Sequence, residues 1–114
     1  MQVEAREMSV ETFVKEKSSQ LSRYIHSYWE GDIVFNELQK FTWDTLEEWT
    51  LEPGKHTVNY STQERLFWHI LYFVQFQTEK SLKPSSLVAE ELEFLLYFLD
   101  SNEPCPLDII GHRP

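Results

Sequence analysis

Apolar residues in the middle of the chain lie on nearly every side of one predicted helix. Ser61 followed by Glu64 has the spacing of a capping box, in which two residues satisfy each other's free backbone N–H groups at a helix start. At about 100° per residue, the segment that continues to Phe76 points large aliphatic and aromatic side chains in almost all directions. Such a helix is stable only where protein surrounds it. The pattern therefore predicts that residues 61–76 form the centre of a helical domain.

Two helices with the same periodicity precede this segment. Ser9 is the predicted N-cap of the first helix, which runs to about Trp29. Asp32 is the predicted cap of the second, which covers about residues 33–50 and ends before a Pro-Gly pair. Trp43 points well away from the apolar stripe of the second helix. Since tryptophan is mostly buried on average, we expect this ring to pack beneath a neighbouring loop.

A fourth helix and an extended tail complete the chain. Ser85 or Ser86 is the predicted cap of this helix, whose broad apolar face includes Glu91 on a helical wheel. The prolines on both sides of Cys105 exclude a helix there. We expect the tail to return to the helices and dock through three aliphatic residues, Leu107, Ile109 and Ile110.

These elements predict a single all-α domain over residues 1–114. A chain of this length with 41% hydrophobic residues can bury a core without disulfides or metals. Short connections make consecutive helices antiparallel neighbours. The expected fold is a four-helix bundle-like array with an extended, docked C-terminal tail.

Three ionisable residues interrupt the apolar pattern and form a candidate polar cluster or pocket. Arg65 and His69 lie four positions apart on the central helix and share one of its faces. Glu91 occupies the apolar arc of the helix that should pack beside it, and a buried carboxylate needs a partner. We interpret the three residues as a cluster that fixes the register of the helices. A binding or acid–base site is the alternative.

Acidic residues dominate the charge of the chain and exclude several classes of partner. The net charge is −9, and residues 30–52 hold seven acidic residues against Lys40 alone. Residues 84–112 hold six acidic residues and no lysine or arginine. Direct binding to nucleic acid or to an anionic membrane requires basic surfaces, so we expect neither.

The composition also indicates a cellular location. No segment approaches the length of about 20 apolar residues that crosses a membrane. The first residues lack the basic start and apolar run of a secretory signal. The only cysteine, Cys105, has no partner for an internal disulfide, which is compatible with a reducing compartment. We expect a cytoplasmic protein.

Motifs that carry catalytic or cofactor chemistry are missing from the sequence. The three glycines are scattered singly, so there is no phosphate-binding loop. No glutamate has a histidine three residues later, as a di-iron bundle requires. Cysteine and histidine residues do not have the paired spacing of a zinc site. We therefore expect no catalytic residues, no metal, no cofactor and no enzymatic activity.

The favoured function is a non-enzymatic protein–protein interaction module. Eight Phe, five Tyr and four Trp exceed what one small core usually needs, and aromatic side chains dominate interface energetics. Self-association as a homodimer is one form of such an interaction. The candidate partner-contact residues lie on the second helix: Trp43, Asp44, Glu47 and Glu48.

Two alternatives remain open. The acidic segments suit an inhibitor or immunity-type protein that covers a basic partner. The chain could instead be a small-ligand sensor with a pocket between helices near His69. Such a pocket would be lined by aromatic residues, namely Trp68, Tyr72 and Phe94.

Overall fold

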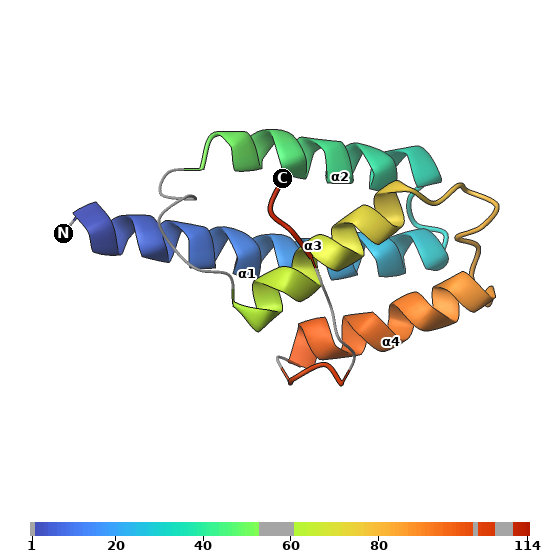
Figure 1. The fold of residues 1–114 in the computed structure, drawn as a ribbon. Helices are drawn as coiled ribbons and strands as arrows, with labels where there is room; N and C mark the ends of the chain where they lie inside the picture. The colour runs from blue at the N-terminus through green and yellow to red at the C-terminus, as the bar shows by residue number, and fades with distance from the viewer. Residues whose placement is uncertain (1, 53–60, 102, 107–110) are drawn as a thin grey trace.

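The computed structural model describes residues 2–52, 61–101, 103–106 and 111–114. These residues contain four helices and no strand. The helices are α1 (Gln2–Trp29), α2 (Phe35–Thr50), α3 (Thr62–Gln75) and α4 (Leu87–Ser101). Figure 1 shows them packed along one another, with the tail crossing α3. The predicted all-α, bundle-like fold is confirmed.

The helices α1 and α3 form the centre of the array. Each packs against the other three helices, whereas α2 and α4 make no contact with each other within the described residues. The helices α2 and α4 therefore cover opposite sides of the α1–α3 pair, as Figure 1 shows. None of the helices in the described ranges combines the length and the apolar character that a membrane span requires.

Half of the residues of α3 are buried, a larger share than in α2 or α4. All four helices contribute to the core around it. The largest fully buried side chains include Leu21, Ile25, Leu38, Trp49, Phe67, Trp68, Ile70, Leu92 and Leu95. Protein does not enclose the predicted segment over its whole length, however. The helix ends at Gln75, and Phe76 at the C-cap is 81% exposed, so the expectation of complete enclosure is wrong at this end.

The first predicted helix begins earlier than expected and stops at a glycine. The helix α1 extends back to Gln2, so Ser9 is inside it and is not its N-cap. At the other end, Gly31 adopts a φ of +84°, a conformation that glycine tolerates without a Cβ clash. The N–H of Gly31 donates to the carbonyl of Tyr28, and the N–H of Asp32 donates to that of Ser27. This is the hydrogen-bond pattern of a Schellman motif.

The predicted cap of α2 is consequently wrong. Asp32 belongs to the end of α1, where its N–H completes the Schellman motif. The helix α2 starts at Phe35, and Val34 occupies its N-cap without a side-chain hydrogen bond.

Serine side chains cap the two remaining helices. Ser61 Oγ accepts a hydrogen bond of 3.0 Å from the N–H of Glu64 at the start of α3. Ser86 Oγ accepts one of 3.0 Å from the N–H of Ala89 at the start of α4, which identifies Ser86 rather than Ser85 as its cap. Each cap satisfies a backbone donor that the helix itself leaves free.

Trp43 stands on the surface of α2 and not beneath a loop. Its side chain is 60% exposed, because it points away from the face that α2 buries. Two threonines on the buried face satisfy their hydroxyls within the helix. Thr42 donates to the carbonyl of Gln39, and Thr45 donates to that of Phe41. The preference of α2 for its apolar face thus leaves the indole of Trp43 in solvent.

The C-terminal tail docks on α3 as predicted, but through residues that the pattern did not single out. Gly111 is buried against the backbone of α3. Arg113 follows it and reaches Glu64 of α3. Leu107, Ile109 and Ile110, which were expected to anchor the tail, lie outside the described residues.

Candidate functional site

The three residues of the predicted polar cluster do not share one buried site. Glu91 and Arg65 are exposed, and His69 is half-buried. The apolar arc that includes Glu91 consists of two faces of α4. One packs into the core, and the other is exposed together with Leu87 and Phe94. Since Glu91 lies on the exposed face, it does not need the buried partner that motivated the prediction.

The buried acidic residue is Glu64, in the first turn of α3. Its side chain is 3% exposed, and that of Arg113 is 10% exposed. Nε of Arg113 donates to Oε2 of Glu64 at 2.5 Å, and Nη2 of Arg113 donates to Oε1 of Glu64 at 2.9 Å. Nε1 of Trp68 also donates to Oε2 at 2.9 Å. The guanidinium and the carboxylate therefore form the two-pronged pair that charged groups need when they leave water.

Two tryptophans form the walls around this ion pair. The guanidinium carbon of Arg113 lies 5.7 Å from the ring centroid of Trp49 on α2, within the range of a cation–π contact. The rings of Trp49 and Trp68 meet edge to face with centroids 5.0 Å apart. Phe13 of α1 packs against both rings, at 5.4 and 6.5 Å. We call Trp49, Glu64 and Trp68 the arginine box. It lies where α1, α2 and α3 converge.

The tail reaches the arginine box along the backbone of α3. A Cβ atom on Gly111 would overlap the carbonyl oxygen of Arg65 and would lie 2.9 Å from the backbone nitrogen of His69. Only a residue without a side chain fits such an approach. Arg65 and His69 thus adjoin the tail through their backbone atoms.

The capping box at Ser61 explains why sequence reasoning missed the arginine box. The spacing to Glu64 predicts that the carboxylate turns back to the N-cap. Ser61 does cap the helix, but the carboxylate binds Trp68 and Arg113 instead. The one local signal was Trp68, four residues after Glu64 and therefore on the same face. No periodicity connects Glu64 to Arg113.

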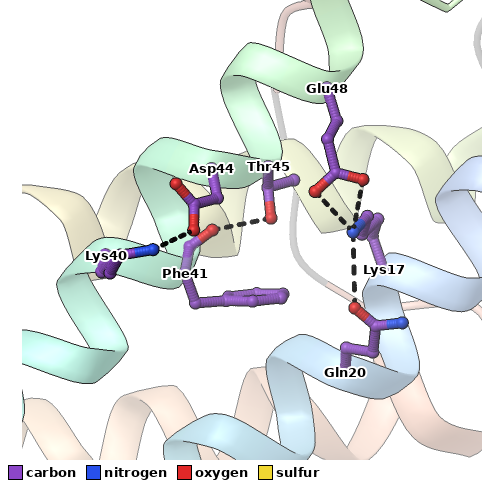
Figure 2. A network of polar contacts seen from close by, with 7 residues as sticks. All are labelled: Lys17, Gln20, Lys40, Phe41, Asp44, Thr45 and Glu48. Atoms are coloured by element: carbon purple, nitrogen blue, oxygen red, sulfur yellow. Dashed lines mark hydrogen bonds and ion pairs between the residues drawn. The ribbon is translucent and has the colours of Figure 1, made fainter.

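The four predicted partner-contact residues are all on α2, and Trp43 and Glu47 point outward. Figure 2 shows the two neighbouring acids held by lysines. Lys40 Nζ lies 2.9 Å from Asp44 one turn later, and Lys17 of α1 lies 3.0 Å from Glu48. Within the described residues, the carboxylate of Glu47 makes no hydrogen bond or ion pair, and its backbone carbonyl accepts from the hydroxyl of Thr50. We call Trp43, Asp44, Glu47 and Glu48 the Trp43 surface.

A serine, a histidine and an aspartate, the residue types of a catalytic triad, meet between α1 and α4, but their hydrogen bonds do not follow the order of a triad. Ser22 Oγ donates to Asp100 Oδ2 at 2.9 Å. His26 Nδ1 lies 2.9 Å from the carbonyl oxygen of Ser22, so this nitrogen carries a proton and donates. A triad needs a histidine between the hydroxyl and the acid, with one nitrogen that accepts from the hydroxyl. The hydroxyl of Ser22 also lies 3.4 Å from Nδ1 of His26, but it donates to Asp100, so the group links α1 and α4.

The aromatic residues that were expected to line a ligand pocket are arranged differently. Trp68 is fully buried and hydrogen-bonded to Glu64, and Tyr72 is half-buried. Phe94 is exposed and packs edge to face on Phe98 within its own helix. Among the described residues, no three histidine, cysteine or acidic side chains converge as metal ligands would.

Comparisons with protein family models, with curated proteins and with solved structures found no match to this chain. The function must therefore be argued from its own residues.

Proposed function

We propose that this protein is a non-enzymatic protein–protein interaction module that holds a basic segment of a partner protein on the Trp43 surface. The observation that carries the proposal is the 60% exposed indole of Trp43 in the middle of a well-packed helix. Exposed tryptophan is costly in water and is the side chain most enriched among interface residues that dominate binding.

The charges around Trp43 favour a basic partner. The helix α2 carries four acidic residues and one lysine, Lys40. Lys40 and Lys17 form ion pairs with Asp44 and Glu48, and neither lysine forms one with Glu47 within the described residues. Glu47 follows Trp43 by four residues and shares its face. An anionic side chain beside a flat indole suits a positively charged ligand.

Arginine is the side chain that fits this pair best. Its guanidinium stacks on an indole face and donates to a carboxylate at the same time, whereas a lysine ammonium is a compact, strongly hydrated point charge. We therefore propose an arginine of the partner between Trp43 and Glu47. The single cysteine, Cys105, is compatible with the reducing cytoplasm, where we propose that the protein acts.

A pull-down at two salt concentrations tests the proposal. The bait proteins are the wild type, Trp43→Ala, Glu47→Gln and the control Leu51→Ala. The control removes an apolar side chain at the C-cap of the same helix that is more exposed than Trp43. We expect basic proteins that bind the wild type and the control at low salt. Trp43→Ala and Glu47→Gln should lose them, and high salt should weaken the binding.

The proposal is overturned if Trp43→Ala retains the same basic proteins as the wild type. It is also overturned if high salt does not weaken their binding to the wild type. Light scattering of the purified protein tests self-association separately, since a homodimer needs no extract. If a retained partner is an enzyme, an assay of its activity with and without this protein distinguishes an inhibitor or immunity-type role from simple association.

A further inference from the structure

The contacts of the tail with α3 select particular residue types at two positions. The position of Gly111 excludes any side chain, because a Cβ atom would overlap the carbonyl of Arg65. The position of Arg113 requires a planar group that donates twice to one carboxylate, and Glu64 receives bonds from two of its nitrogens. The residues of the tail that make these two contacts have the pattern Gly-x-Arg.

The arginine box contains a buried carboxylate, that of Glu64, and therefore needs a positively charged partner. The side chain of Glu64 is 3% exposed, and within the described residues its carboxylate accepts hydrogen bonds from Arg113 and Trp68. An ionised carboxylate in such a place is strongly destabilised when its counterion leaves. The face of Trp49 adds a second contact that favours a guanidinium. These groups form a built site for arginine.

We propose that the arginine box and the adjoining backbone of residues 65–69 form a binding site for Gly-x-Arg segments. Residues 111–113 occupy it as an intramolecular ligand, and a Gly-x-Arg segment of a partner protein displaces them. This inference goes beyond the Trp43 surface and rests on different residues. Because the tail is part of the same chain, its effective concentration at the site is on the order of millimolar. A partner segment must compete with that concentration, so the tail sets a threshold for binding.

The test uses the full chain with the tail released and a peptide supplied in trans. The variant Gly111→Ala/Arg113→Ala loses both anchors of the tail but keeps Trp49, Glu64 and Trp68. The probe is a peptide with free ends blocked and the sequence Gly-His-Arg-Pro, that of residues 111–114. The control peptides are Gly-His-Lys-Pro and Ala-His-Arg-Pro. The NMR signal of the Trp68 indole N–H, identified with Trp68→Phe, reports directly on Glu64.

We expect the Gly-His-Arg-Pro peptide to shift the Trp68 signal of the variant, with an affinity about tenfold or more above that of either control peptide. The wild type should need about tenfold more peptide, because its own tail competes. Equal binding of the lysine peptide, or equal binding to wild type and variant, would refute the site. Absence of any shift in the folded variant would refute it as well.

A second variant covers the case in which the released-tail protein does not fold. Arg113→Met keeps the aliphatic length of the side chain and removes only the guanidinium. In this variant the arginine peptide should raise the melting temperature and the lysine peptide should not. A peptide that stabilises neither variant contradicts the proposal. Retention of basic proteins through Trp43 is independent of this result, so the two proposals fail separately.

Discussion

The ion pair between Glu64 and Arg113 should contribute to stability as a coupled unit. The perturbation is a double-mutant cycle with Glu64→Met, Arg113→Met and both together. Methionine keeps the approximate length of each side chain while removing its charge and its hydrogen bonds. The cycle therefore isolates the interaction between the two groups.

The structure indicates the size of each effect. Arg113→Met leaves a carboxylate that is 3% exposed without its counterion, and removal of one partner from a buried pair costs about 3–5 kcal/mol. Glu64→Met leaves the guanidinium of Arg113, whose side chain is 10% exposed, without its carboxylate, and it also removes the acceptor of Trp68 Nε1. An unpaired buried donor costs about 1–3 kcal/mol. The double variant retains only this second cost.

We therefore expect each single variant to lose about 3 kcal/mol and the double variant to lose no more than either. The coupling energy should be about 3 kcal/mol, near the upper end of the range for residues in contact. Urea denaturation measures these values if the slope m is the same for all four proteins. In a chain of this size, a loss of 3 kcal/mol corresponds to a fall in melting temperature of roughly 10 °C.

The exposed pair Lys40–Asp44 provides the control cycle. Its side chains are 76% and 48% exposed, and solvent-exposed pairs of this kind couple far more weakly than buried ones. Additive losses at Glu64 and Arg113, with a coupling as small as that of Lys40 and Asp44, would show that the pair is not a buried unit. The description of the arginine box would then be wrong.

Three further predictions follow from individual contacts. Gly111→Ala should lower the free energy of unfolding by about 1–3 kcal/mol, because the added Cβ meets the backbone of α3. At Gly31 a Cβ meets nothing within 4 Å and only the positive φ is unfavourable, so Gly31→Asn should be more stable than Gly31→Ala. Urea denaturation of the three variants measures this contrast. Trp43→Ala should change the free energy of unfolding by less than about 0.5 kcal/mol, whereas Trp49→Ala, which empties a buried site, should cost about 3–5 kcal/mol; a Trp43→Ala protein that melts much earlier would show that the ring belongs to the core. The hydroxyl of Tyr97 donates to Glu103 at 2.5 Å, and this hydrogen bond with the nearby negative charge raises the pKa of Tyr97 above its usual 10.0. The raised pKa favours the protonated phenol in the folded state, so its contribution is present below pH 10 and is lost as the pH rises through the folded pKa; in an absorbance titration, with Tyr97→Phe to identify the signal, Glu103→Gln should lower this pKa, and an unchanged value would contradict the assignment.

The sequence pattern was sufficient to predict the existence of the four helices and the serine caps of α3 and α4, but not the caps of α1 and α2. The apolar positions of α3 and the serines at its start and at the start of α4 are local features of a few neighbouring residues. The chain between α1 and α2 was harder, because Asp32 is a good cap by type. The positive φ of Gly31 instead assigns Asp32 to the end of α1.

The candidate site depends on contacts that no local pattern encodes. Glu64 and Arg113 are 49 positions apart, and the spacing around Glu64 favours a local hydrogen bond that the carboxylate does not make. Glu91 shows the opposite case. Its wheel position among apolar residues was read correctly, but some of those apolar residues are themselves exposed. A broad apolar arc does not say which part of it faces the core.

The helix α2 carries residues of both proposed sites, yet the two sites should act independently. Trp43 and Trp49 are six positions apart, which places them about 120° apart around the helix axis. The ring of Trp49 is fixed by Phe13 and Trp68 inside the core, and Lys17 joins α2 to α1 on the remaining side. Trp49 also contacts Arg113 of the tail, but its contacts with Phe13 and Trp68 do not depend on that arginine, so we expect α2 to keep its position when Arg113 leaves. We therefore expect partner binding at Trp43 to leave exchange of the Gly-x-Arg segment unchanged, because no moving element would connect the two sites.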